Sequence, residues 1–220
     1  MLASWSGEST SYDVRVEAEW SKSGRPYRKS LERREEIVSR AMELFAEQGV
    51  GASLRSIGDA IGVSHAALRY YFPTRDDLLV AVYRAHEQAV ADLPENSPQP
   101  NESAVETMER SAILNRTIPG LVELYATLTT DALQAERHPT TRAFVQRRFR
   151  QVRADLTERV RQGQRAGTVA EDIAPEDAAS LVAAASDGLQ IQWLLDPDGV
   201  DVHRSLRLLE RLFPGRGRAD

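Results

Sequence analysis

Beyond residue 30, apolar side chains recur at intervals of three and four residues, and glycine or proline repeatedly interrupts the pattern. The first stripe predicts an amphipathic helix from residue 31 that ends at Gly49, with Ser30 as a candidate N-cap. This stripe consists of Ile37, Ala41, Leu44 and Phe45. Because no β-rich stretch or internal repeat follows, the pattern predicts an all-α fold.

Two very short helical segments come next. Ser53 and Ser64 are suited to be their N-caps, Gly62 separates them, and Pro73 ends the second one. Helices of this length do not persist alone in water. We therefore expect both to pack against the first helix through their apolar residues, which are Leu54, Ile57, Leu68 and Phe72. A capping box of Thr74 and Asp77 predicts a fourth helix to about Val90.

This packing leaves the polar side of the second short segment facing outward. A short helix that is held by a three-helix core and presents polar residues is typical of a helix-turn-helix, whose second helix enters the major groove of DNA. Hydroxyl groups, aromatic rings and guanidinium groups suit phosphate and base contacts. A segment before the first helix, GRPYRKS at 24–30, is a candidate basic arm. The predicted DNA contacts are Arg25, Arg28, Lys29, Ser53, Arg55, Ser64, His65, Ala66, Arg69, Tyr70, Tyr71 and Arg75.

Three of these residues also have simpler interpretations. Tyr70 and Tyr71 are candidate core aromatics, and His65 is a candidate solvated surface residue. The charge distribution favours a polyanionic partner: residues 22–75 hold ten Lys/Arg against six Asp/Glu, although the whole chain has a net charge of −5.

The rest of the chain predicts three regions. Residues 1–30 form an N-terminal extension, with a faint strand-like alternation at 14–20; residues 31–78 form the helix-turn-helix domain; and residues 79–220 form a ligand-binding and dimerisation domain. A proline-containing stretch at 92–103 is predicted to be a loop or linker. Further helices are expected near 104–115, 119–136, 140–166, 175–195 and 201–213.

The run from Glu32 to about Leu79 resembles the DNA-binding domain of tetracycline-repressor-type (TetR family) regulators. The matching segments are REEIVSRAMELFAEQGV, Ser53, the pair Ile57/Ala60, GVS at 62–64, Leu68, Phe72 and PTRDDLL at 73–79. The chain departs from the family pattern with Arg69 where Tyr is usual, Arg75 where Lys is usual, and Ala66 for a frequent Gly. The resemblance implies a homodimeric regulator that binds a palindromic duplex, with a small-molecule effector releasing it as a repressor.

The helix at 175–195 is a candidate dimer element because small residues recur on it every four positions, allowing close backbone approach. The predicted interface residues are Ser180, Leu181, Ala184 and Gly188 on this helix, with Leu206 and Leu209 on the helix expected near 201–213. The alternative is an ordinary core helix of a monomer. The effector pocket that the resemblance implies combines aromatic and hydrogen-bonding candidates, for each of which core packing is the alternative. These candidates are Tyr125, Thr129, Phe144, Phe149, Gln190 and Trp193.

Enzyme classes find little support. The four histidines are far apart, and HExxH, G-x-S-x-G, P-loop and GxGxxG motifs are missing from the sequence. We therefore expect no catalytic activity, no cofactor and no metal. With no cysteine, no signal peptide and no membrane-spanning run, the sequence predicts a cytoplasmic protein without a membrane partner. The alternative function is a helical ligand-binding or hydrolytic protein with a vestigial helix-turn-helix, for which Asp131, His138 and Asp187 are the candidate hydrolytic residues.

Overall fold

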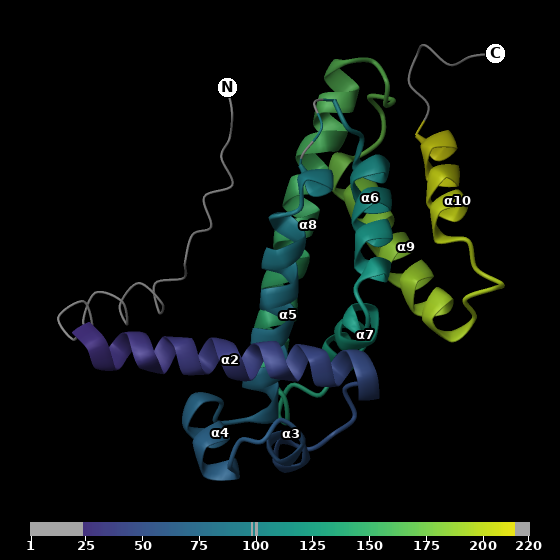
Figure 1. The fold of residues 1–220 in the computed structure, drawn as a ribbon. Helices are drawn as coiled ribbons and strands as arrows, with labels where there is room; N and C mark the ends of the chain where they lie inside the picture. The colour runs from purple at the N-terminus through teal and green to yellow at the C-terminus, as the bar shows by residue number, and fades with distance from the viewer. Residues whose placement is uncertain (1–23, 98, 100, 214–220) are drawn as a thin grey trace.

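The structure is a computed structural model that describes residues 24–97, 99 and 101–213. This described part contains helices and turns but no strand, which confirms the predicted all-α class. The helices are α2 (Gly24–Gln48), α3 (Leu54–Ala60), α4 (His65–Tyr71), α5 (Arg75–Ala91), α6 (Ala104–Thr117), α7 (Leu121–Asp131), α8 (Pro139–Arg165), α9 (Pro175–Leu195) and α10 (Val202–Arg207), with the 3-10 turns η1 (Pro94–Asn96) and η2 (Leu208–Leu212). Helices α2, α3 and α4 lie at one end of the molecule and α10 lies toward the other (Figure 1).

The first helix begins earlier than predicted. Because α2 begins at Gly24, Ser30 lies inside the helix and is not its N-cap. Pro26 lies in the first turn, where its missing N–H costs no hydrogen bond. The predicted basic arm at 24–30 is therefore helical, while the strand-like alternation at 14–20 lies outside the described residues.

The predicted N-caps of the two short helices and of the helix that follows them are confirmed. The hydroxyl of Ser53 accepts a hydrogen bond from the third backbone N–H of α3 at 3.1 Å, and the hydroxyl of Ser64 does the same for α4 at 3.2 Å. Thr74 and Asp77 form the expected capping box at the start of α5. Each of these caps supplies an acceptor to an N–H group that has no partner inside its own helix.

The turn between α3 and α4 depends on two glycines and one arginine. Gly62 has a φ of 70°, a conformation that L side chains rarely adopt. A Cβ on Gly58 would lie 2.8 Å from the carbonyl oxygen of Val63, so only glycine lets the two helices approach this closely. From α2, Nη1 of Arg40 donates to the carbonyl oxygen of Ile61 at 2.9 Å. These contacts fix the angle between α3 and α4.

One hydrophobic core spans the helix-turn-helix and part of the larger region. Leu68 and Phe72 at α4, Leu78 and Leu79 on α5, and Phe144 on α8 are all buried in it. The predicted division between residues 78 and 79 is therefore no boundary between two cores, because α5 continues through it. A second core joins α6, α9, α10 and the carboxyl-terminal half of α8.

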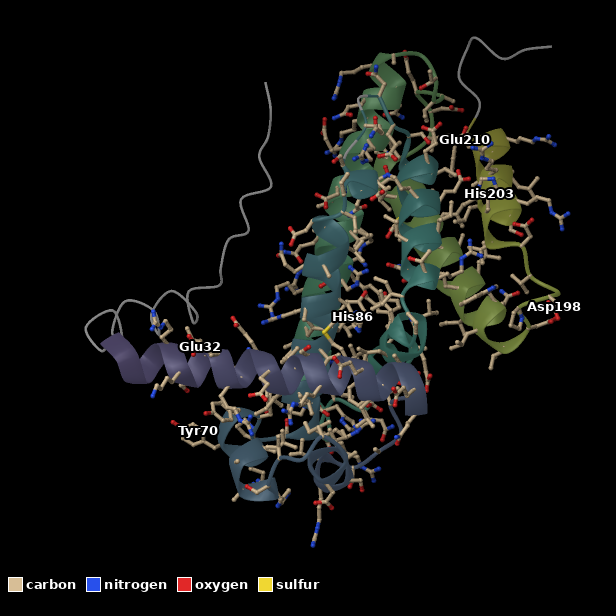
Figure 2. All side chains as sticks on the ribbon, in the orientation of Figure 1. Glu32, Tyr70, His86, Asp198, His203 and Glu210 are labelled. Carbon is tan, nitrogen blue, oxygen red and sulfur yellow. The ribbon has the colours of Figure 1, made fainter. Side chains whose placement is uncertain are left out.

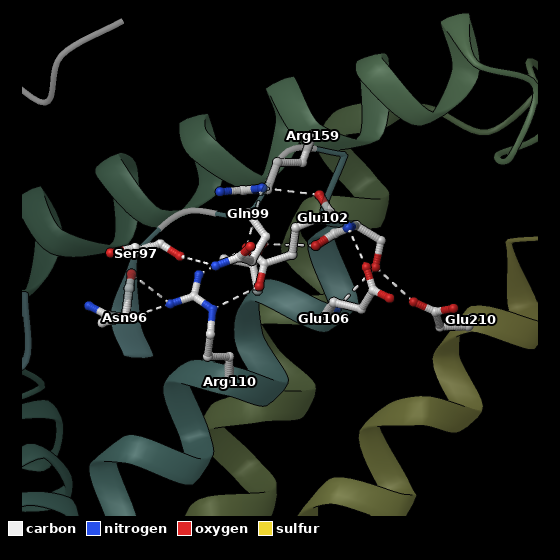
Figure 3. A network of polar contacts seen from close by, with 10 residues as sticks. Asn96, Ser97, Gln99, Glu102, Glu106, Arg110, Arg159 and Glu210 are labelled. Carbon is white, nitrogen blue, oxygen red and sulfur yellow. Dashed lines mark hydrogen bonds and ion pairs between the residues drawn. The ribbon is translucent and has the colours of Figure 1, made fainter. Parts of the chain in front are cut away.

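Described residues of the stretch predicted as a linker at 92–103 take part in a polar network (Figure 3). The carboxylate of Glu102 contacts Arg110 of α6 at 2.8 Å and Arg159 of α8 at 3.6 Å. Arg110 also donates to the carbonyl oxygen of Asn96 at 2.9 Å. Since only 6% of the Glu102 side chain is exposed, these partners balance a largely buried charge.

Two later predictions need correction. The helix predicted at 119–136 ends at Asp131, and turns follow it. The helix predicted at 201–213 consists of α10 followed by η2. Among the described residues, no helix combines the length and the apolar character needed to cross a membrane.

Candidate nucleic-acid interface

The outer side of α4 carries the predicted DNA contacts. Ser64, His65, Ala66 and Arg69 are exposed, and Tyr70 is 75% exposed. Figure 2 shows Tyr70 on the outer side of α4, away from the larger helical region. The opposite side of α4 carries Leu68, which is fully buried. The buried side therefore orients the polar side toward solvent.

Residues at the start of α3 extend this surface. Ser53 and Arg55 are both exposed. The oxygens of Ser53 and Ser64 accept their cap bonds, and the hydroxyls of Ser53 and Ser56 share a further hydrogen bond at 2.8 Å. The hydroxyl hydrogen of Ser64 can still donate to a phosphate oxygen. Hydroxyl and guanidinium groups on one exposed surface are the usual means of contacting a nucleic-acid backbone.

Tyr71 has a different environment from Tyr70. It is half-buried and packs against the first core, and its ring meets that of Tyr70 edge to face with centroids 4.9 Å apart. This environment favours the interpretation of Tyr71 as a core aromatic that supports Tyr70. The predicted DNA contact by Tyr71 is therefore limited to its exposed part.

Arg75 is engaged inside the protein, contrary to its prediction as a phosphate contact. Its Nε donates to the carbonyl oxygen of Ala52 at 3.0 Å, its Nη2 to that of Val50 at 2.5 Å, and its Nη1 to Asp131 at 3.3 Å. These contacts tie α5 to the loop before α3 and to the end of α7. We therefore remove Arg75 from the DNA-contacting set, because its guanidinium is needed to join these segments.

The basic residues before position 30 lie along the first turns of α2. Arg28 is exposed and pairs with Glu32 at 3.4 Å, and Lys29 is also exposed. The backbone of Arg25 is helical, while its side chain lies outside the described residues. Arg28 and Lys29 therefore project from a helix and not from an extended arm.

Two of the predicted effector residues meet in an aromatic cluster that also contains Tyr83 of α5. The rings of Tyr83 and Tyr125 stack with centroids 5.6 Å apart, and Phe144 meets Tyr83 edge to face at 5.6 Å. Tyr83, which the sequence analysis did not single out as a site residue, lies at the centre of this cluster. The one signal in the sequence was its helical spacing from Leu79 on the same helix, which predicts that Tyr83 is buried.

Charged groups surround these rings, and two of them, Arg148 and Glu87, were not singled out in the sequence. The guanidinium carbon of Arg148 lies 5.1 Å from the ring centroid of Tyr125 and 5.3 Å from that of Tyr83. Arg148 also contacts Glu87 at 2.9 Å, while the hydroxyl of Tyr125 donates to Asp187 at 3.0 Å. Burial raises the pKa of the Glu87 and Asp187 carboxyl groups, and the charge of Arg148 partly offsets this increase.

The other predicted effector residues are less closely grouped. Gln190 is buried and accepts a hydrogen bond from Asn115 at 3.1 Å, and the ring of Trp193 lies 5.5 Å from the guanidinium of Arg116. Thr129 bonds to carbonyl oxygens of its own helix, and Phe149 packs against the first core. For Thr129 and Phe149 the packing interpretation fits better.

The predicted dimer residues divide into two groups. On α9, Ser180 and Ala184 are exposed, Leu181 is 47% exposed, and a Cβ on Gly188 would meet no atom within 4 Å. Leu206, in contrast, is fully buried inside its own chain, and Leu209 packs against the second core. The assignment of Leu206 to the dimer interface is therefore wrong, because its side chain is buried in the core of its own chain and has no exposed surface for a partner to contact.

Only two of the three candidate hydrolytic residues lie together. Asp131 and His138 do lie close together, beside Asp76. Asp187 instead accepts the hydrogen bond from Tyr125. The three residues proposed for hydrolysis therefore do not form one group.

Comparison with known proteins gives a consistent result. Residues 37–82 match the model for bacterial regulatory proteins of the tetR family, and residues 131–214 match the model for the C-terminal region of BetI-type transcriptional repressors. The HTH-type transcriptional regulator PksA of Bacillus subtilis is 38% identical over 61 residues. That match spans 27% of this chain and only 30% of the relative's length.

Solved structures share the fold over most of the chain. A protein described as a transcriptional regulator of Saccharomonospora viridis, in complex with choline, gives a TM-score of 0.62 at 23% identity and covers 82% of this chain and 95% of its own. A TetR-family regulator of Rhodococcus sp. gives a TM-score of 0.64 at 20% identity, with coverages of 81% and 95%. At these identities the likeness establishes the fold alone.

The contacts of Arg75 predict a stability difference between two arginines of this end of the molecule. Replacing Arg75 by Ala removes hydrogen bonds from a charged donor to two carbonyl oxygens, so we expect the free energy of unfolding to fall by about 2 kcal/mol. Replacing the exposed Arg55 by Ala is expected to change it by less than about 0.5 kcal/mol. Urea denaturation followed by circular dichroism measures both, and equal losses would contradict the internal role of Arg75.

Proposed function

Because the chain belongs to the TetR family of bacterial regulatory proteins, we propose that it binds operator DNA as a homodimer and represses transcription until a small molecule releases it. The observation that carries this proposal is the outer side of α4. There, Arg69 and the 75%-exposed Tyr70 face solvent, while Leu68 on the same helix is buried in the core. Exposed aromatic and cationic residues on a short, supported helix suit insertion into a major groove.

One copy of this helix covers one half of an operator, so specific binding needs a second copy. The exposed side of α9 supports this dimer, with Leu181 and Ala184 in the middle of the helix and Leu195 at its end. Leu195 is 81% exposed, and on η2 Leu208 and Leu212 are 54% and 61% exposed. A surface of this kind, made of large apolar and small side chains, is typical of a protein–protein contact. We propose that α9 and η2 of two chains pack together and that the operator is palindromic.

We place the effector at the cluster of Tyr83, Tyr125 and Phe144. Its two stacked rings already hold a cation, the guanidinium of Arg148, and the carboxyl groups of Glu87 and Asp187 lie beside it. An organic cation can make the same contacts with the ring faces and the acids. The structural relative that was solved with choline supports this choice of ligand class.

Helix α5 supplies the connection between effector and DNA. Its first residue, Arg75, is bonded to the loop before α3, and Tyr83 and Glu87 on the same helix belong to the effector cluster. A ligand that binds one position of α5 more tightly than another shifts the equilibrium between the two positions. We propose that this shift changes the distance between the two α4 helices and so lowers DNA affinity.

The DNA interface predicts large effects for two substitutions. Arg69→Ala and Tyr70→Ala should each weaken binding to the intergenic duplex beside the gene by tenfold or more, because each base or phosphate contact contributes about 1–3 kcal/mol. Fluorescence anisotropy at fixed salt measures this affinity. Arg150→Ala, at an exposed position on α8, is the matched control and should bind as the unchanged protein does. If all three variants bind equally well, α4 is not the contact surface.

The dimer surface gives a test with a closely matched pair. Leu195 and Leu133 are both 81% exposed, but only Leu195 belongs to the proposed interface. Leu195→Asp should weaken the dimer by about 100-fold, since a buried unpaired charge costs about 3 kcal/mol. Leu133→Asp should leave it unchanged. Light scattering after gel filtration gives both masses, and a monomeric unchanged protein would contradict the proposal.

The effector class can be tested with two molecules of the same shape. Choline should release the labelled duplex, whereas its uncharged carbon isostere 3,3-dimethylbutanol should require at least tenfold higher concentration, because it lacks the cation–π attraction. Tyr125→Leu should abolish the choline response while leaving DNA binding intact. A full choline response in this variant would instead favour a separate cavity of about 460 Å³ beside Val105 and Val160.

A further inference from the structure

Three side chains with metal-binding atoms meet where the helix-turn-helix joins the larger region. Asp76 is the second residue of α5, Asp131 is the last residue of α7, and His138 precedes α8. Each offers one ligand atom, and the three atoms lie within 4.8 Å of one another. Because Asp76 is 62 residues from His138 in the chain, only the folded structure brings this group together.

The distances within the group suit a small divalent ion. Nδ1 of His138 lies 2.9 Å from Oδ1 of Asp76 and 3.1 Å from its Oδ2. Two ligands that each bind zinc at about 2.0–2.2 Å are themselves separated by about 3–3.5 Å. Asp76 and His138 therefore already have the separation of neighbouring ligands, and Asp131 needs only a short approach to become the third.

The charge balance also favours a cation. Two of the three side chains are carboxylates, and the guanidinium of Arg75 contacts one of them, that of Asp131, at 3.3 Å. That contact is the longest of the three that Arg75 makes, since its bonds to Ala52 and Val50 measure 3.0 Å and 2.5 Å. Arg75 can therefore release Asp131 to a metal and keep its bonds to the loop before α3.

The three side chains are partly buried, and the exposed part of His138 and Asp131 lets solvent reach the group. The side chain of Asp76 is 8% exposed and that of His138 is 24% exposed, while that of Asp131 is 18% exposed. Three protein ligands with one partly open side match a site in which water completes the coordination. One imidazole nitrogen and two carboxylate oxygens favour Zn²⁺ or a neighbouring first-row ion over Mg²⁺, which prefers oxygen ligands alone.

We propose that Asp76, Asp131 and His138 bind one Zn²⁺ ion, or a similar divalent first-row ion, per chain. The ion links the start of α5 to the α7–α8 turn, so it restrains the joint through which α5 connects the two ends of the molecule. Metal binding is thus a second input to the protein, separate from the aromatic cluster around Tyr83. A consequence is that the ion changes the response of the chain to its effector without touching DNA.

The test measures metal binding to the full chain after treatment with a chelator. Isothermal titration with Zn²⁺ should show one saturable site per chain, Mg²⁺ should show none, and Zn²⁺ should raise the melting temperature. His138→Gln and Asp131→Asn should each weaken zinc binding by at least tenfold and remove this rise in melting temperature. Circular dichroism without metal establishes that both variants are folded.

His203→Gln is the matched control. His203 also contacts a buried carboxylate, that of Glu109 on α6, but it lies outside the proposed group. This variant should bind zinc as tightly as the unchanged protein does. Equal affinities of His138→Gln and His203→Gln, or no saturable zinc binding below millimolar concentration, would overturn the proposal. Neither readout involves DNA, so the result is independent of the proposed regulatory function.

Discussion

Burial of one side of two seven-residue helices is the constraint on which the rest of this structure depends. Neither α3 nor α4 is long enough to persist alone. Ile57 and Leu68 are fully buried in the core to which α2 and α5 also contribute, and Arg40 holds the turn between them through the carbonyl oxygen of Ile61. The core thus determines which side of α4 faces outward. The outward position of Arg69 and Tyr70 follows from this packing and not from any preference of their own.

Helix α5 extends this constraint into the rest of the protein. All the residues from Leu78 to Tyr83, more than one turn of the helix, are buried, so α5 cannot move without disturbing its packing against α2, α7 and α8. Arg75 bonds it to the loop before α3, and Asp76 bonds it to His138 at the α7–α8 turn. The proposed effector cluster and the proposed metal group both contact this one helix. That arrangement gives two chemically different ligands a common route to α4.

Local features of the fold could be predicted from the sequence because they depend on neighbouring residues. The caps at Ser53, Ser64 and Thr74 require only a side-chain oxygen three positions before an unpaired N–H. The start of α2 was missed because residues 1–30 were interpreted as an extension outside the main fold, although Pro26 is tolerated in a first helical turn. The apolar pattern itself placed nearly all the helices.

Contacts between distant segments could not be predicted in the same way. The internal role of Arg75, the burial of Leu206 and the hydrogen bond between Tyr125 and Asp187 all depend on how helices pack. Exposed and internal arginines look alike in a sequence, and an apolar stripe on a terminal helix suits a partner chain as well as its own core. The sequence analysis named Asp131 and His138 together but joined them to Asp187 instead of Asp76, because the members of the group come from three separate segments.

The central claim is that the outer side of α4 lies against the bases of a duplex. Photocrosslinking to intergenic DNA that contains 5-iodouracil tests it most directly, because the activated base reacts with aromatic side chains that it touches. Mass spectrometry of the digested complex should find the crosslink on Tyr70 or His65. Crosslinks confined to α6, α8 or α9, with none on α4, would contradict the account.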